Sequence, residues 1–79
     1  MQIKILGPGC KNCTNLEKNV RTALNELGRE AEIDKVTDYA EIMSHGVMST
    51  PGLVIDGEVV SYGRVPKPEE IRELITRLG

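Results

Sequence analysis

Two cysteines separated by two residues are the most reactive feature of the sequence. Cys10 and Cys13 are the chain's two cysteines. At the start of a helix this spacing puts their Cα atoms about 5–6 Å apart, which a disulfide can bridge. Unpaired N–H groups at the helix start, together with Lys11, should lower the pKa of Cys10 and favour its thiolate. We therefore predict that Cys10 attacks a disulfide and that Cys13 resolves the resulting mixed disulfide.

The elements on either side of this pair follow from the spacing of apolar residues. Residues 2–6 form a short β-branched run that stops at the turn signals of residues 7–9, which predicts a strand and then a turn. Residues 11–27 carry apolar side chains at helical spacing, and Gly28 follows as a stop. Counting back along that stripe places Cys13 on the buried side and Cys10 at the exposed tip. The stripe consists of Leu16, Val20, Ala23, Leu24 and Leu27.

The rest of the chain predicts two further helices and three further strands. Residues 31–36 read as a second strand, and Asp38 can cap a short helix that ends at Gly46. Asp56-Gly57 links two β-rich runs and indicates a hairpin. Pro66 and Pro68 introduce an amphipathic helix over residues 68–78.

The predicted order is therefore β-α-β-α-β-β-α, an α/β fold. Its first two strands are joined through a helix and should be parallel, with a right-handed crossover. The last two strands should form an antiparallel hairpin. We expect a four-stranded mixed sheet flanked by helices in a single domain over residues 1–79.

Composition excludes several classes of function. The chain has 79 residues, a net charge of −2, and neither Trp nor Phe. Its charges are scattered, so nucleic acid is not an expected partner. No apolar run is long enough for a signal peptide or a membrane span. We expect a cytoplasmic monomer without membrane contact. Paired thiols in that compartment are typically catalytic or metal-binding rather than structural.

Two motifs resemble those of the thioredoxin/glutaredoxin superfamily: Cys10-Lys11-Asn12-Cys13 after the first strand and Ser49-Thr50-Pro51 before the third. The chain looks most similar to the minimal thioredoxin-like redox-active disulfide proteins of archaea and bacteria. The resemblance implies a thioredoxin fold and a protein-disulfide oxidoreductase. It further implies that Pro51 is cis and that Thr50 binds substrate through its backbone. We expect Gly9, Lys11 and Asn12 to contribute to substrate binding as well.

The same resemblance implies the partners. These are client proteins with disulfides and a separate disulfide reductase as electron donor, so that no bound cofactor is needed. The chain departs from the family at Lys4, where full thioredoxins have a buried acid, and at Gly9, where they have Trp. It also has no acidic residue over 62–65, so glutathione binding is not implied.

Two other functions use the same thiols. A soft-metal module could hold a monovalent ion between two thiolates, although small copper chaperones end in a strand rather than a helix. A four-ligand metal site does not fit two cysteines and one histidine, so no resident metal is expected. A redox switch that controls a binding interaction is the second alternative. Of the remaining residues, we expect His45 to be a surface residue, and Met43 and Met48 to fill the core rather than line a peptide-binding surface.

Overall fold

The molecule is built on one four-stranded mixed sheet. The structure, a computed structural model, describes residues 1–9 and 11–78. The strands lie in the order β2-β1-β3-β4. β1 is parallel to β2, and β3 is antiparallel to both β1 and β4. Their bounds are Gln2–Leu6 for β1, Glu32–Val36 for β2, Gly52–Ile55 for β3 and Glu58–Tyr62 for β4. The predicted order, strand directions and α/β fold are confirmed.

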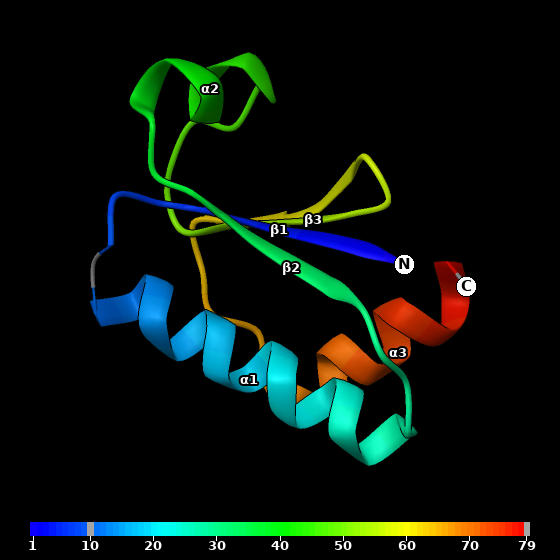
Figure 1. Ribbon diagram of the computed structural model, residues 1–79. Coiled ribbons are helices and arrows are strands. Elements are labelled where there is room, and N and C mark those ends of the chain that lie inside the picture. Colours follow the sequence, from blue (N-terminus) through cyan, green and yellow to red (C-terminus); the bar gives the residue numbers. More distant parts are fainter. Residues whose placement is uncertain (10, 79) are drawn as a thin grey trace.

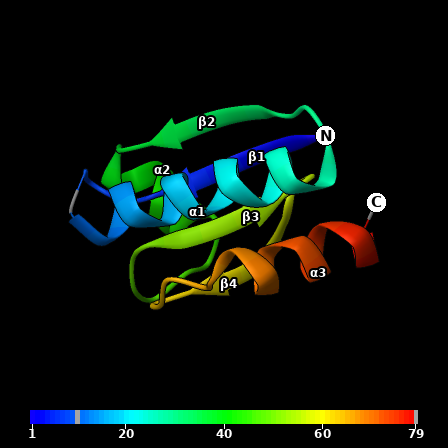
Figure 2. The same ribbon diagram turned by 90° about the horizontal axis from the view of Figure 1, so that it is seen from below.

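Three helices cover the two faces of this sheet unequally. α1 (Lys11–Leu27) and α3 (Pro68–Leu78) lie side by side on one face, and α2 (Tyr39–Ser44) lies on the other (Figures 1 and 2). The first helix occupies the residues that its apolar stripe predicts. The N-terminus and the last turn of α3 lie at one end of the sheet, and the first turn of α1 lies at the opposite end (Figure 2).

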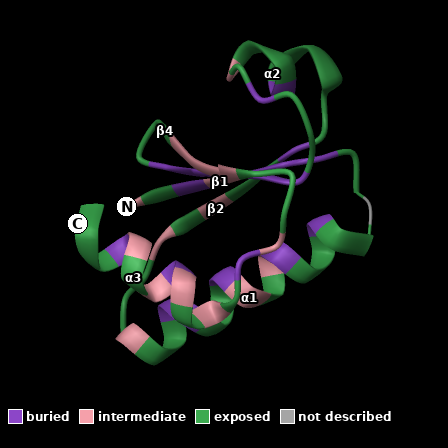
Figure 3. Ribbon diagram, turned by 180° about the vertical axis from the view of Figure 1, so that it is seen from behind, coloured by how far each residue is buried: buried purple, intermediate pink, exposed green. Residues whose placement is uncertain are grey.

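The alternation of side chains along β1 explains how the sheet supports two cores. Successive side chains of a strand point to opposite faces. Ile3 and Ile5 belong to the larger buried cluster, which includes the apolar stripes of α1 and α3. Leu6 belongs to a smaller cluster that includes Ile42 of α2. The helices accordingly turn their buried residues toward the sheet and their exposed residues outward (Figure 3).

Two local signals in the sequence are confirmed at atomic detail. The Asp38 side chain caps α2 by accepting a hydrogen bond of 3.1 Å from the backbone N–H of Ala40. The hairpin turns at Asp56 and Gly57, whose φ angles are 49° and 84°. Positive φ at both central residues is what a type I′ hairpin turn requires. Among the described residues, no helix has the length and apolar content needed to cross a membrane.

Candidate functional site

Cys13 lies on the buried side of the first turn of α1. It is 6% exposed and follows the same helical stripe as Leu16 and Val20. The predicted burial of this thiol is therefore confirmed. Cys13 is disulfide-bonded in the structure. The other cysteine of the sequence, Cys10, lies outside the described residues. Its exposure therefore stays a prediction.

The backbone at Gly7 lies directly against the sulfur of Cys13. A methyl group at Gly7 would overlap the Cys13 Sγ, lie 3.3 Å from its Cβ, and reach within 4.0 Å of the Cα of Pro51. The backbone N–H of Gly7 donates a hydrogen bond of 2.9 Å to the carbonyl of Val36, which anchors this loop to the end of β2. The loop after β1 therefore lies close to both the sulfur of Cys13 and the start of β3.

The Thr50–Pro51 peptide bond is cis, as the resemblance implied. Pro51 is buried, whereas Thr50 and Ser49 are exposed. The carbonyl of Pro51 accepts a hydrogen bond of 2.9 Å from the backbone N–H of Gly63. Gly63 has a φ of 74°, and a side chain there would overlap the Oγ of Ser49. The two loops before β3 and after β4 are therefore joined beside the cysteine.

The predicted site residues that the structure describes lie at one end of the sheet. Gly9, Lys11 and Asn12 are exposed at the junction of β1 and α1. Thr50 is exposed on the neighbouring loop, next to buried Pro51. The arrangement combines a shielded sulfur with exposed backbone on both sides of it. Such an arrangement can accommodate an extended segment of another protein beside a reactive thiol.

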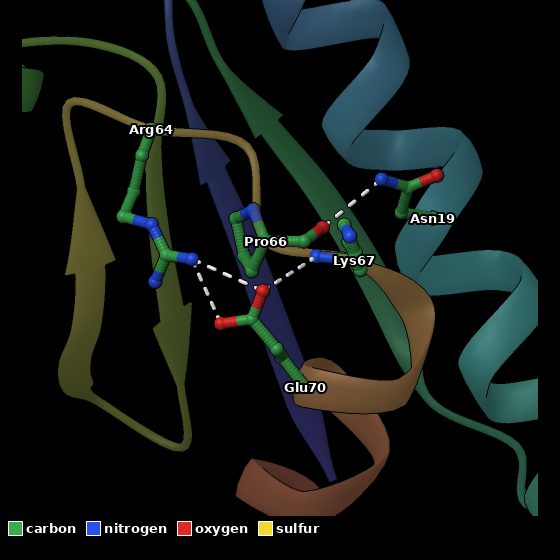
Figure 4. Close-up of polar contacts among 5 residues, drawn as sticks. All are labelled: Asn19, Arg64, Pro66, Lys67 and Glu70. Carbon is green, nitrogen blue, oxygen red and sulfur yellow. Dashed lines mark hydrogen bonds and ion pairs between the residues drawn. The ribbon is translucent and has the colours of Figure 1, made fainter.

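The segment that follows Gly63 is fixed by polar contacts to two helices (Figure 4). The Arg64 guanidinium donates hydrogen bonds of 2.7 and 3.0 Å to the two carboxylate oxygens of Glu70 on α3. The backbone N–H of Lys67 also donates to Glu70, and the Asn19 amide of α1 donates a hydrogen bond of 3.0 Å to the Pro66 carbonyl. The hydrogen bonds from Arg64, and then that from Lys67, lower the pKa of Glu70.

Cys13 also lines a small cavity, and an ion pair forms part of the wall of that cavity. Its volume is about 60 Å³, and its lining includes Cys13, Glu17 and Lys35. Lys35 Nζ of β2 lies 3.0 Å from Glu17 Oε1 of α1. Neither Glu17 nor Lys35 is among the site residues that the sequence predicts. The sequence feature that could have identified Glu17 is its position four residues after Cys13 on the same helix.

The two methionines and the histidine that the sequence analysis considered lie at or near the surface. Met43 and Met48 are 51% and 89% exposed, so the expectation that they fill the core is wrong. In the smaller cluster, Ile42 supplies the buried residue of α2, and its neighbour Met43 consequently faces outward. His45 is partly exposed. Within residues 1–9 and 11–78, no three His, Cys, Asp or Glu side chains are placed to hold a metal ion together.

Comparison with known proteins matches the chain to a thioredoxin-domain family model and to two archaeal thioredoxins. A family model described as a thioredoxin domain matches residues 1–76. A thioredoxin of Methanothermobacter thermautotrophicus is 45% identical over 76 residues, covering 96% of this chain and 99% of that protein. A thioredoxin of Methanocaldococcus jannaschii is 46% identical over 71 residues, covering 90% of this chain and 81% of that protein. An alkyl hydroperoxide reductase protein of Pseudomonas putida is 29% identical over 72 residues, which are 14% of its length.

Proposed function

Because the chain belongs to the thioredoxin-domain family, we propose that this thioredoxin-like redox protein reduces protein disulfides through Cys10 and Cys13. One observation carries the proposal. Cys13 is shielded at the start of α1, with its sulfur against the backbone of Gly7 and beside cis-Pro51. A shielded sulfur is suited to the second step of an exchange reaction, because it reacts with a neighbouring sulfur rather than with bulk solutes.

The reaction has two steps that balance in atoms and electrons. The Cys10 thiolate attacks one sulfur of a substrate disulfide, forms a mixed disulfide, and releases the other substrate sulfur as a thiolate. Cys13 then loses its proton and attacks the Cys10 sulfur, which breaks the mixed disulfide and releases the second substrate thiolate. The substrate gains two electrons, and the protein ends as the Cys10–Cys13 disulfide. A separate reductase returns two electrons to the pair.

Substrate binding is assigned to the exposed backbone around the sulfur. Thr50 precedes cis-Pro51 and is exposed, which suits it to pair its backbone with an extended client segment. Gly9, Lys11 and Asn12 are exposed where β1 leads into α1, and we assign them to the same binding surface. The hydrogen bond between Gly63 and Pro51 keeps the loop that carries Thr50 in place.

Insulin reduction in the presence of dithiothreitol tests this function. The wild-type protein should accelerate the precipitation of insulin B chain, and Cys10→Ser should not. Asn15→Ala, at an exposed position of α1 outside the proposed binding residues, is the matched control, because it keeps both thiols and should retain most of the activity. Failure of the wild type, with the cysteine pair shown by mass spectrometry to open and close, would favour a redox switch over a disulfide reductase.

A further inference from the structure

The ion pair between Glu17 and Lys35 forms part of the wall of a water-sized cavity that Cys13 also lines. The cavity of about 60 Å³ can admit a water molecule and has the polar wall that ordered water needs. Thr14 and Thr37 line it together with Cys13 and the two charged residues. The mechanism above uses Cys13 but assigns no task to either charged residue.

Helix geometry brings the Glu17 carboxylate toward Cys13. Residues four apart on a helix share one face, and side chains lean toward the N-terminus of the helix. Glu17 and Cys13 accordingly line the same cavity. Its side chain is 15% exposed, whereas those of its partners Lys35 and Arg21 are 63% and 62% exposed. The negative charge of Glu17 is therefore the more buried, and the positive charges of Lys35 and Arg21 lie closer to solvent.

Within the described part of the chain, the other elements around the cavity add no competing charge. β1 contributes Ile5 to the lining, and the loop after β1 contributes Gly7 and Gly9. Lys4 lies on the opposite face of β1, because Ile5 next to it packs on the α1 side. The charges that act on this side of Cys13 are therefore those of Glu17 and Lys35 in the lining, with Arg21 of α1 paired to Glu17.

The protein also keeps Glu17 ionised. Hydrogen bonds from Lys35 and then Arg21 lower the pKa of the Glu17 carboxyl, against the opposing effect of its desolvation. A carboxylate beside a thiol disfavours the thiolate by Coulomb repulsion, and this effect is strong where solvent screening is weak. Glu17 is therefore negatively charged at the neutral to alkaline pH at which thiols ordinarily ionise.

We propose that Glu17 is a positioning residue, whose carboxylate at the cavity wall keeps Cys13 protonated while Cys10 carries out the attack. This inference rests on the proposed function, because it explains how two neighbouring cysteines take different roles. Cys13 gives up its proton once the mixed disulfide has formed, and water in the cavity carries that proton to solvent. Loss of the Glu17 charge should make Cys13 ionise at lower pH, and loss of the Lys35 charge should have the opposite effect.

The test is an NMR titration of the Cys13 Cβ resonance in cysteine-labelled, full-length Cys10→Ser protein. Adding Glu17→Gln should lower the pH midpoint of Cys13 ionisation by about one unit, as expected for one poorly screened charge nearby. Adding Lys35→Gln should raise the midpoint. Glu73→Gln is the matched control, because it breaks an i,i+4 pair with Arg77 on α3 that does not line the cavity. It should leave the midpoint unchanged.

The two substitutions make the outcome decisive. Opposite shifts in Glu17→Gln and Lys35→Gln, with none in the control, would support the proposal. Equal midpoints in all four proteins, or shifts of the same sign, would overturn it. If Glu17→Gln does not fold, Lys35→Gln still tests the sign. Insulin reduction by the wild type is measured separately, so that loss of the proposed function and loss of this inference are read from different experiments.

Discussion

At Gly7 the sulfur of Cys13 occupies the space that any side chain would need. Gly7 is followed by Pro8 and Gly9, so the sequence identifies the segment as a turn but does not reveal this contact. The requirement at Gly7 is steric, because its φ is not in the left-handed region, whereas Gly9 has a φ of 89°. The residue is therefore part of the site rather than of the turn alone.

Substitution Gly7→Ala should destabilise the protein and impair exchange together. The added methyl must displace Cys13 or the loop, which should cost about 1–3 kcal/mol of unfolding free energy. Urea denaturation measures this loss. Asn12→Ala, on the exposed side of the same helix start, should change stability by less than about 0.5 kcal/mol. Equal stability of Gly7→Ala and wild type would contradict the close contact between Gly7 and the sulfur of Cys13.

At the scale of elements, the segment between β4 and α3 connects the site to the helical layer. Its end near the site is joined to Pro51 through Gly63, and its other end is fixed by Glu70 and Asn19 (Figure 4). The Arg64–Glu70 pair is an exposed one, so its contribution to stability is small and depends on ionisation.

The ionisation of Glu70 predicts a pH dependence of stability. Its pKa is lowered in the folded protein, so its contribution is present above the ordinary glutamate pKa and is lost as pH falls through the folded value. Glu70→Gln should therefore be less stable than wild type near about pH 7 and equally stable near about pH 2. Urea midpoints across this range measure the difference. A constant difference at all pH values would show that the pair does not act through charge.

At the scale of the whole molecule, the two faces of the sheet carry cores of different size. The larger cluster joins β1 and β3 to α1 and α3, and the smaller one contains a single residue of α2, Ile42. Regions with few buried contacts open locally at low free energy, whereas core elements open with global unfolding. α2 is therefore the element most weakly attached to the sheet.

Hydrogen exchange should separate the two layers. Amide protons of α2 should exchange by local opening, well before those in the middle of α1. Denaturant at low concentration should speed exchange in α1 and leave that of α2 nearly unchanged, because local opening exposes little surface. Equal protection of the two helices would contradict the unequal attachment.

The sequence predicts the parts of this structure that local chemistry determines. The apolar stripe of α1, the Asp56-Gly57 turn and the Asp38 cap each depend on a few neighbouring residues, and all three are confirmed. The pair between Glu17 and Lys35 depends on the packing of α1 against β2 and could not be predicted locally. The exposure of Met43 likewise depends on tertiary packing, because the smaller cluster buries Ile42 of the six-residue α2 and leaves Met43 outside.

Trapping of a mixed disulfide tests the central claim, the division of roles between the two cysteines, most directly. Cys13→Ser and Cys10→Ser proteins are each incubated with a disulfide-bonded client and analysed by intact-mass spectrometry. The account predicts that Cys13→Ser accumulates a covalent adduct through Cys10, and that Cys10→Ser accumulates little, because its remaining sulfur is shielded. Equal adducts in both variants, or a predominant adduct through Cys13, would contradict it.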